Sequence, residues 1–425
     1  MKHKLTIPAL FAAVAMIAGE IHMDPAGTLR NEKDEPQFLC GAVCGHHAYA
    51  GVTRFSKKFR GTYPEEFRWI YETLPDKAYW LRLGFNSVIT NNDSYVLRVF
   101  FPDYKENLNT DPWKHYDSGV RKYSLKRSRA HWSEEPVLQT KAAIRTYRGF
   151  PFFADCFIPV GRNRQDDAKL LPKEARVKDR FAFHQRNIPF QLGSPEGRDA
   201  LFKMYSYMVK SYTELGVSPL GYRVITENRF QDYSDGNRKR FAERLQKKFG
   251  SVEAMNKAWK TSYAGFGDAA KLSENKEFYS IPAGIEYLKM EQEQAMKAYA
   301  DLHKLIKTLD PKSYGAIIQT LGRHMYRTNS SNLNLFRMNQ ALNMVSSGTG
   351  NYTFTLENVD DDILFKDAPS ISEDLRESLI RDAFYRAIAK NKPLLNLEVY
   401  GVGSHYTAQA FNSVLWRELA TGHSA

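Results

Sequence analysis

Short apolar segments alternate with longer amphipathic segments along most of the chain. The apolar segments predict buried strands, and the segments between them have the spacing of apolar residues that is typical of helices. The seven predicted strands lie at Gln37–Val43, Asn86–Thr90, around Phe150, and at Leu220–Thr226, Ser313–Thr320, Leu342–Ser347 and Pro393–Val399. Because strands that alternate with helices pair in parallel through right-handed crossovers, the pattern predicts the α/β class and favours a (β/α)8 TIM barrel over an open sheet.

The eighth strand of such a barrel has no counterpart in this pattern. After the seventh predicted strand the chain has room for a turn and one helix, AQAFNSVLWRELATG, so we expect the barrel to lack its eighth strand at the C-terminus. An open barrel would expose two strand edges, which proteins normally avoid. For this reason we expect the chain, made alone, to be poorly soluble or inactive.

The chain opens with two lysines and an apolar run, MKHKLTIPALFAAVAMIAG, which predicts an export signal over residues 1–22. The apolar part, Leu5–Gly19, is shorter than the roughly 20 residues that a membrane-spanning helix requires, and no later segment is long and apolar enough to cross a membrane. We therefore expect an exported protein, periplasmic or extracellular, whose barrel occupies residues 37–425 with a polar, aromatic-rich insertion around 91–180.

Net charge indicates which binding partners to expect, and the cysteine count indicates whether disulfides or zinc are expected. The 60 Lys and Arg against 48 Asp and Glu give a formal net charge of +12, which favours anionic partners such as an acidic polysaccharide. The densest basic runs are short, and NRKRFAERLQKKFG places its charges around apolar helical positions, so no nucleic-acid partner is expected. The three cysteines, Cys40, Cys44 and Cys156, are too few for a disulfide framework or a zinc cluster.

Two carboxylates stand where predicted strands end. Glu227 directly follows Leu220–Thr226, the fourth predicted strand, and Glu398 lies at the end of Pro393–Val399, the seventh. The chemistry of a TIM barrel lies at the carboxyl ends of its strands, and strands four and seven face one another across the barrel mouth. Retaining glycosidases need two carboxyl groups about 5 to 5.5 Å apart, one as nucleophile and one as acid and then base. This pair therefore predicts a retaining glycosidase.

Two quoted stretches carry a family resemblance. The segment SPEGRDALFKMYSYMVKSYTELGVSPLGYRVITEN and the later KKFGSVEAMNKAWKTSY resemble the region of the family-42 glycoside hydrolases, a β-galactosidase-like group of retaining barrels, that bears the acid/base glutamate. Upstream, AYWLRLGFNSV is similar to the helix that leads into strand two of that family. The resemblance runs from about Phe38 to the end of the chain.

The resemblance implies roles for individual residues. Glu227 matches the acid/base glutamate of the family and Glu398 its nucleophile. The family usually has Asn directly before the acid/base to bind the sugar 2-hydroxyl; here Thr226 takes that place and Asn228 follows Glu227. The cysteine cluster that binds zinc in many members is replaced by QDYSDGNRK, so no zinc and no other cofactor is expected.

Other predicted strand ends offer weaker sugar-binding candidates. Tyr352 follows the sixth strand, Gln319 ends the fifth, and His46 and His47 follow the first. Each side chain could bind a sugar hydroxyl or could take part only in packing and internal hydrogen bonds.

Three interpretations remain open at this point. The first is an exported retaining exo-glycosidase acting on β-galactosides. The second keeps the mechanism but makes the substrate an acidic polysaccharide, because of the net charge and the aromatic insertion. The third is a non-catalytic barrel that only binds sugar. The substrate is an oligosaccharide or polysaccharide in each case, and an oligomer is possible.

Overall fold

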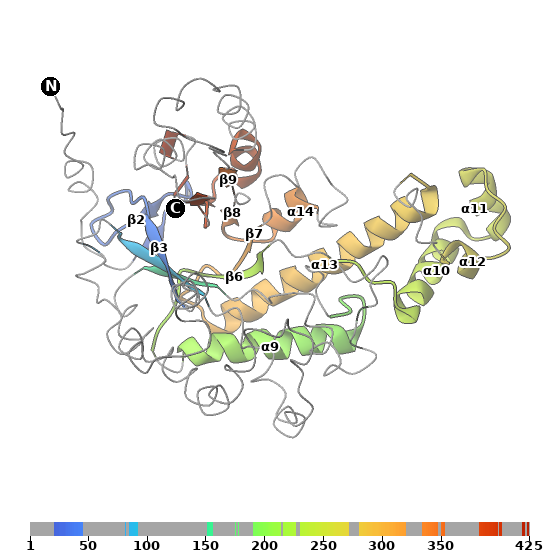
Figure 1. Cartoon of the computed structure of the whole chain (residues 1–425), viewed down its shortest axis with the longest axis horizontal. Coiled ribbons are helices and arrows are strands. Elements are labelled where there is room, and N and C mark those ends of the chain that lie inside the picture. The colour runs from blue at the N-terminus through green and yellow to red at the C-terminus, as the bar shows by residue number, and fades with distance from the viewer. Residues whose placement is uncertain are drawn as a thin grey trace, which may run out of the picture.

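The structure is a computed structural model of the whole chain (Figure 1). It describes residues 21–45, 81, 85–91, 151–155, 175, 177, 190–213, 216–226, 230–271, 280–319, 334–346, 350–352, 382–397, 399–401, 419–420 and 423–424. Residues 1–20 of the predicted export signal and most of the predicted insertion at 91–180 lie outside the described residues, so those two predictions are not tested.

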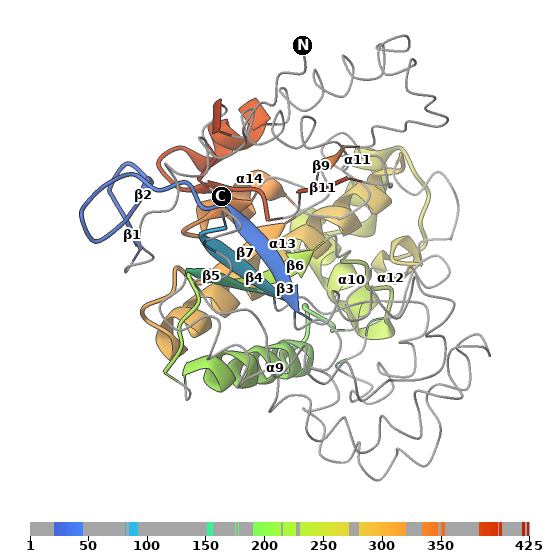
Figure 2. The same ribbon diagram turned by 60° about the vertical axis from the view of Figure 1, so that its left-hand side comes forward.

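Five parallel strands form the central sheet (Figure 2). Their order in the sheet follows their order in the chain, and each neighbouring pair is parallel. They are β3 (Gly41–Gly45), β4 (Ser87–Asn91), β5 (Phe152–Asp155), β6 (Gly221–Thr226) and β7 (Ala316–Gln319). Each overlaps one of the first five predicted strands, so the α/β class and the parallel pairing are confirmed.

The sixth and seventh predicted strands are also present. The short strand β8 (Val345–Ser346) lies beside β7 and pairs in parallel with β10 (Leu394–Leu395). Beyond them β9 (Gly350–Tyr352) pairs in parallel with β11 (Val399–Gly401). Within the described residues the hydrogen-bonded ladder is not continuous from β7 to β8, so these strands do not form one closed sheet.

A two-residue segment at the end of the chain lies next to both the seventh strand and the first. His423 forms a parallel bridge with Leu394, and the Ser424 N–H donates to the Leu394 carbonyl at 2.7 Å. On its other side the Ser424 carbonyl accepts from the Leu39 N–H at 2.8 Å, just before β3. The predicted lack of an eighth strand is therefore not confirmed, because these residues lie where an eighth strand would be.

Two helices cover the outer face of the sheet. These are α9 (Pro195–Thr213) and α13 (Pro282–Leu309), and each places a buried apolar stripe against the strands. Alternation along each strand supplies the other half of this core, since Phe152, Tyr222 and Ile318 all belong to it. The stripes of the two helices are Leu201, Met204, Tyr205, Met208, Val209 and Tyr212 from α9, and Ala295, Ala298, Tyr299, Leu302 and Ile306 from α13.

The opposite face of the sheet has a separate apolar core inside the ring of strands. Its members alternate along the strands with the helix-facing residues, so that Phe153 and Ile317 point inward between outward neighbours. The full set is Leu29, Leu39, Ile89, Phe153, Ile317, Met344, Leu395 and Leu397. Side chains of β4, β5, β7 and β10, together with Leu39 just before β3, thus meet in one interior, as in a packed barrel.

Polar contacts fasten the C-terminal end of α13 to the beginnings of two strands. Asp310, which caps the helix, accepts hydrogen bonds from the Ser218 hydroxyl at 2.7 Å and the Tyr222 hydroxyl at 2.8 Å. Two turns earlier, Nδ1 of the buried His303 accepts from the Ala316 N–H at 3.1 Å. Gly315 allows this approach, because its φ is +91° and a Cβ there would lie 2.5 Å from the His303 ring.

Three short helices form a separate module at the other end of α13 (Figure 1). They are α10 (Asp235–Phe249), α11 (Val252–Trp259) and α12 (Phe266–Ala269). Their core joins the first turns of α13, where Tyr287 packs edge-on against Phe241 with centroids 4.8 Å apart. The core comprises Tyr233, Phe241, Leu245, Met255, Ala269, Ala270, Ala283, Tyr287 and Met290. The barrel and this module therefore share one helix.

The pattern of apolar residues did not predict the first element of the structure, an antiparallel pair of β1 (His22–Met23) and β2 (Leu29–Arg30). Asp24 organises its turn by accepting from the Ala26 and Thr28 N–H groups and from Arg30 Nε at 2.6 Å. The Arg30 guanidinium holds the pKa of Asp24 below its usual value. None of the helices that the structure describes could cross a membrane.

We expect Ser424→Pro to lower the free energy of unfolding by about 1 to 3 kcal/mol, because proline cannot donate to the Leu394 carbonyl and leaves that acceptor unpaired. Urea denaturation of the purified variant measures the change. Ser424→Ala is the matched control, since the hydrogen bonds at this position use the backbone alone. Equal stability of both variants and the unaltered chain would show that this segment does not fasten the barrel.

We also expect stability to fall as the pH drops from 7.5 to 5. Burial, with smaller contributions from the charges of Lys307 and Lys392, lowers the pKa of His303 to about 4, whereas an ordinary imidazole titrates near 6.5. The unfolded chain therefore binds the proton first, so the His303 contribution is complete above pH 6.5 and is lost between 6.5 and 4, by up to about 2 kcal/mol at pH 5. Urea unfolding at the two pH values measures it.

His303→Gln is the control for this pH effect, because its amide oxygen can still accept from the Ala316 N–H but does not titrate in this range. The difference in stability between pH 7.5 and 5 should be smaller in His303→Gln than in the unaltered chain. The same difference in both proteins would contradict the role assigned to His303.

Candidate active site

The predicted catalytic residues adjoin described strand ends but lie outside the described residues themselves. Glu227 directly follows Thr226, the last residue of β6, and Glu398 stands between the described Leu397 and Val399. Asn228 and His46 also lie outside the described residues. Thr226 and Tyr352 are described as strand residues without their side chains, whereas Gln319 is described in full.

A bulge shapes the end of β6. Arg223 pairs with Ile317 of β7, but the next pair is Ile225 with Ile318, so β6 has one residue more than β7 over this step. Val224 is the extra residue, and its carbonyl accepts a hydrogen bond from the buried Tyr205 hydroxyl of α9 at 2.8 Å. Bulges re-aim the side chains that follow them and are common beside active sites. Here the bulge brings Thr226 into register with Gln319 at the carboxyl edge of the sheet.

A buried arginine and a glutamine are hydrogen-bonded to each other just below this edge. Arg223 Nη1 donates to Gln319 Oε1 at 2.9 Å, and both side chains are buried, with 2% and 0% of their surface exposed. Burying a guanidinium is costly unless it is hydrogen-bonded, so Gln319 stabilises Arg223 in the interior. The Gln319 Nε2 group has no partner in the described structure. Gln319 therefore holds Arg223 and retains one donor for another acceptor.

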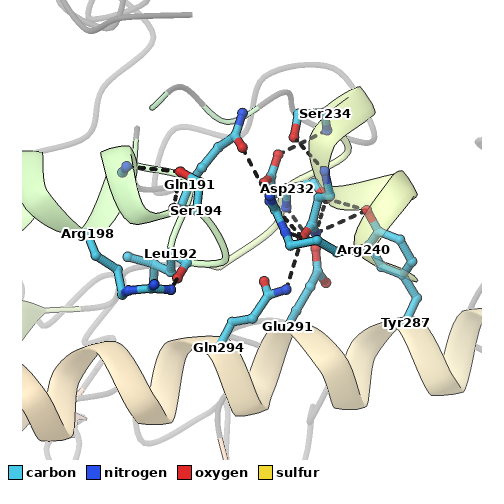
Figure 3. A network of polar contacts seen from close by, with 12 residues as sticks. Gln191, Leu192, Ser194, Arg198, Asp232, Ser234, Arg240, Tyr287, Glu291 and Gln294 are labelled. Atoms are coloured by element: carbon cyan, nitrogen blue, oxygen red, sulfur yellow. Dashed lines mark hydrogen bonds and ion pairs between the residues drawn. The ribbon is translucent and has the colours of Figure 1, made fainter. Parts of the chain in front are cut away.

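A second polar cluster anchors the chain shortly after β6 (Figure 3). At its centre Asn237, which is completely buried, donates from Nδ2 to the Asp232 carbonyl at 2.9 Å and to the Tyr287 hydroxyl at 3.1 Å. The Tyr287 hydroxyl donates to the same Asp232 carbonyl at 2.6 Å, and the Asp232 N–H donates to Glu291 Oε1 at 2.7 Å. Both backbone groups of Asp232 are thus bound by side chains of α10 and α13.

The same asparagine also connects to the segment before α9 (Figure 3). The Asn237 Oδ1 atom accepts hydrogen bonds from Arg240 Nε at 3.3 Å and from Gln294 Nε2 at 3.0 Å. Arg240 in turn donates from Nη2 to Gln191 Oε1 at 3.3 Å. Burial lowers the pKa of Arg240, although the nearby Asp232 carboxylate opposes this effect. A Cβ at Gly193 would lie 2.7 Å from Gln294 and 2.8 Å from Arg240, so both of these side chains would have to shift to admit one.

The structure shows two buried polar residues in this region that the sequence did not predict. Arg223 and Asn237 were not predicted as site residues, although a charged residue in an apolar strand was a usable signal for Arg223. The segment QDYSDGNRK, predicted to bind no zinc, instead supplies Asp232, Ser234 and Asn237 to internal hydrogen bonds. Across the described ranges, His, Cys, Asp and Glu side chains do not come together in threes to hold a metal ion.

Comparison with known proteins identifies related sequences and folds. A family model described as "Beta-galactosidase", that of glycoside hydrolase family 42, matches residues 170–413. A search of the curated proteins gives no match.

Several solved structures are similar in fold. The β-galactosidase from Rahnella sp. R3 has 12% identity and a TM-score of 0.57, covering 91% of this chain and 49% of that chain. The apo exo-carrageenase of family 42 from Bacteroides ovatus has 12% identity and a TM-score of 0.50, covering 97% and 49%. The catalytic domain of the β-amylase from Paenibacillus polymyxa has 12% identity and a TM-score of 0.52, covering 91% of both chains.

These similarities establish the fold. The strands and helices described above belong to a TIM-barrel fold shared with those enzymes. The chain spans about half the length of the family-42 structures that it matches.

We expect Gln319→Leu to lower the free energy of unfolding by about 1 to 3 kcal/mol, because it removes the Oε1 acceptor from the buried Arg223. Gln319→Glu keeps an acceptor oxygen and adds an opposite charge, so it should be markedly more stable than Gln319→Leu. Urea denaturation of both variants beside the unaltered chain measures this order. The reverse order would show that Arg223 does not depend on Gln319.

Proposed function

The chain belongs to the family-42 glycoside hydrolases, and on this premise we propose that it hydrolyses β-galactosides with retention of anomeric configuration. The family match includes both Glu227 and Glu398. The match also includes β6 to β11, the strands that these two glutamates adjoin in sequence.

The observation that carries the proposal is the position of the two strands that precede the glutamates. Counted around the ring, β6 is the fourth strand and β10 the seventh, and all their described neighbours run parallel. Parallel strands of a barrel bring their carboxyl ends to one edge, so we expect the residues that follow Thr226 and Leu397 to share that edge. Two carboxylates at this edge suit a retaining mechanism.

In the proposed mechanism Glu398 attacks the anomeric carbon while Glu227 protonates the oxygen of the leaving group. The bond from the anomeric carbon to that oxygen breaks, and a galactosyl ester of Glu398 forms. Glu227, now ionised, then removes a proton from water as the water attacks the same carbon. The ester bond breaks, and the sugar leaves with its original configuration while Glu227 is protonated again.

Further residues are proposed to bind the sugar. Thr226 and Asn228 flank Glu227 in sequence and are proposed to hold the 2-hydroxyl, and His46 and Tyr352 are proposed to bind other hydroxyls because they follow the first and sixth predicted strands in sequence. For Gln319 the contact with Arg223 supports a role beneath the sugar, in ordering the carboxyl edge of the sheet, because its side chain is fully buried.

A second candidate function is cleavage of an acidic polysaccharide by the same two glutamates. The net charge of +12 favours anionic substrates, and one family-42 structure of similar fold is an exo-carrageenase, named for an anionic polysaccharide. A non-catalytic, sugar-binding barrel is the third candidate, motivated by Thr226 in place of the usual asparagine. Export to the periplasm or the exterior is part of the proposal and is supported by the pattern of residues 1–22.

We expect Glu227→Ala to lower turnover of an alkyl β-galactoside by about 10² to 10⁴-fold, because the leaving group must then depart without a proton. Azide should restore turnover of an activated aryl galactoside by attacking the galactosyl ester.

A 2-fluoro galactoside should label Glu398 alone, as read by mass spectrometry of the peptides. The unaltered chain is assayed in parallel on galactosides and on a panel of neutral and sulfated polysaccharides.

Glu243→Ala is the control for this prediction, since Glu243 is an exposed residue of α10 and should be dispensable for turnover. Label on another residue, or inverted product, would refute the proposed mechanism. Cleavage of a sulfated polymer without galactoside turnover would favour the second candidate. Binding without turnover of any member of the panel would favour the third.

A further inference from the structure

The three residues after β6 connect two firmly held ends of the chain. On one side Thr226 is the last residue of β6 and pairs with Gln319. On the other side Phe230 is buried and packs edge-on against Tyr299 of α13, with ring centroids 5.5 Å apart. Glu227 is the first of these three residues. In sequence, Glu227 therefore lies between a paired strand end and a buried aromatic residue that is held against α13.

The strongest fixation of that chain is at Asp232. Its N–H donates to Glu291, and its carbonyl accepts from both Asn237 and Tyr287. We name these four residues, Asp232, Asn237, Tyr287 and Glu291, the Asp232 clamp, and Figure 3 labels Asp232, Tyr287 and Glu291. Asn237 and Tyr287 are completely buried, and Glu291 is 3% exposed, so water does not compete readily for these bonds.

Tyr287 and Glu291 of the clamp belong to α13, and the C-terminal end of this helix is fixed to the sheet where two strands begin. Tyr287 and Glu291 lie in the first half of this 28-residue helix, while His303 and Asp310 bind the beginnings of β7 and β6 at its other end. At 1.5 Å per residue the helix is about 42 Å long. It acts as a rigid strut that relates the chain after β6 to the strands themselves.

We propose that the Asp232 clamp positions the segment after strand four, and with it the acid/base Glu227. The catalytic part of this inference rests on the proposed function. Tyr287 and Asn237 are positioning residues, because they act on Asp232 and the chain before it and are not proposed to touch the sugar. Small displacements of a catalytic group are costly, on the order of 10²-fold in rate for about 1 Å.

Two tyrosines provide a matched test. Tyr287→Phe removes one buried hydroxyl from the clamp, and Tyr222→Phe removes one buried hydroxyl that donates to Asp310 at the opposite end of α13. Both side chains are 0% exposed, and both changes keep the ring. The two variants therefore suffer similar losses of stability but differ in which end of the strut they loosen. Asn237→Ala is a second clamp variant.

The first measurement is amide hydrogen exchange, which does not depend on activity. We expect the peptide covering residues 226–234 to exchange faster in Tyr287→Phe and Asn237→Ala, and to keep the rate of the unaltered chain in Tyr222→Phe. Unchanged exchange of this peptide in both clamp variants overturns the proposal. This result holds whether or not the chain hydrolyses galactosides.

The second measurement separates positioning from loss of folded protein. A poor leaving group needs the acid, whereas an activated aryl leaving group does not, so the ratio of kcat/KM on alkyl to aryl galactosides should fall about tenfold or more in the clamp variants. Incomplete folding lowers both rates equally and leaves the ratio unchanged, as we expect for Tyr222→Phe. An unchanged ratio in the clamp variants overturns the catalytic role. If the unaltered chain hydrolyses no galactoside, the proposed function fails, and hydrogen exchange still decides whether the clamp holds the segment.

Discussion

The packing of α13 on the outer face of the sheet is the contact on which the rest of the described structure depends. Ala295 and Ala298 keep the helix close to the strands, and Tyr299, Leu302 and Ile306 fill the space between them. Burial of these side chains supplies the non-directional stabilisation, while His303 and Asp310 fix the helix along its own axis. Because the same helix continues into the α10–α12 module, its seating on the sheet determines where that module and the chain after β6 are held.

Much of the barrel could be predicted from sequence because its strands are buried on both faces. Such strands are continuous apolar runs, and all seven predicted runs contain an observed strand. The β1–β2 pair escaped prediction because it depends on the Asp24 turn and not on an apolar pattern. The contacts of His423 and Ser424 could not be predicted for a related reason. Two residues that are held by backbone hydrogen bonds do not produce a periodic pattern of apolar residues in the sequence.

The candidate site was predictable only in part. A carboxylate after an apolar strand marks Glu227 and Glu398 as candidates, but nothing in the spacing of residues reveals the bulge at Val224 or the pairing of Arg223 with Gln319. These features arise from the register between β6 and β7, which is set by tertiary contacts. Asn237 was equally hidden, because an asparagine near a helix start is usual for local capping and its partners Tyr287 and Gln294 are about 50 residues away.

Among the described residues, the buried members of the apolar core of the α10–α12 module come from its own helices and their ends, Tyr233 and the beginning of α13. Its outer surface is therefore free to diverge during evolution without disturbing the barrel, and new binding specificities could arise there at little cost to folding. The attachment points have no such freedom. Gly193 and Asn237 both lie close to the side chains of Gln294 and Arg240, so a substitution at either position would disturb three segments of the chain at once.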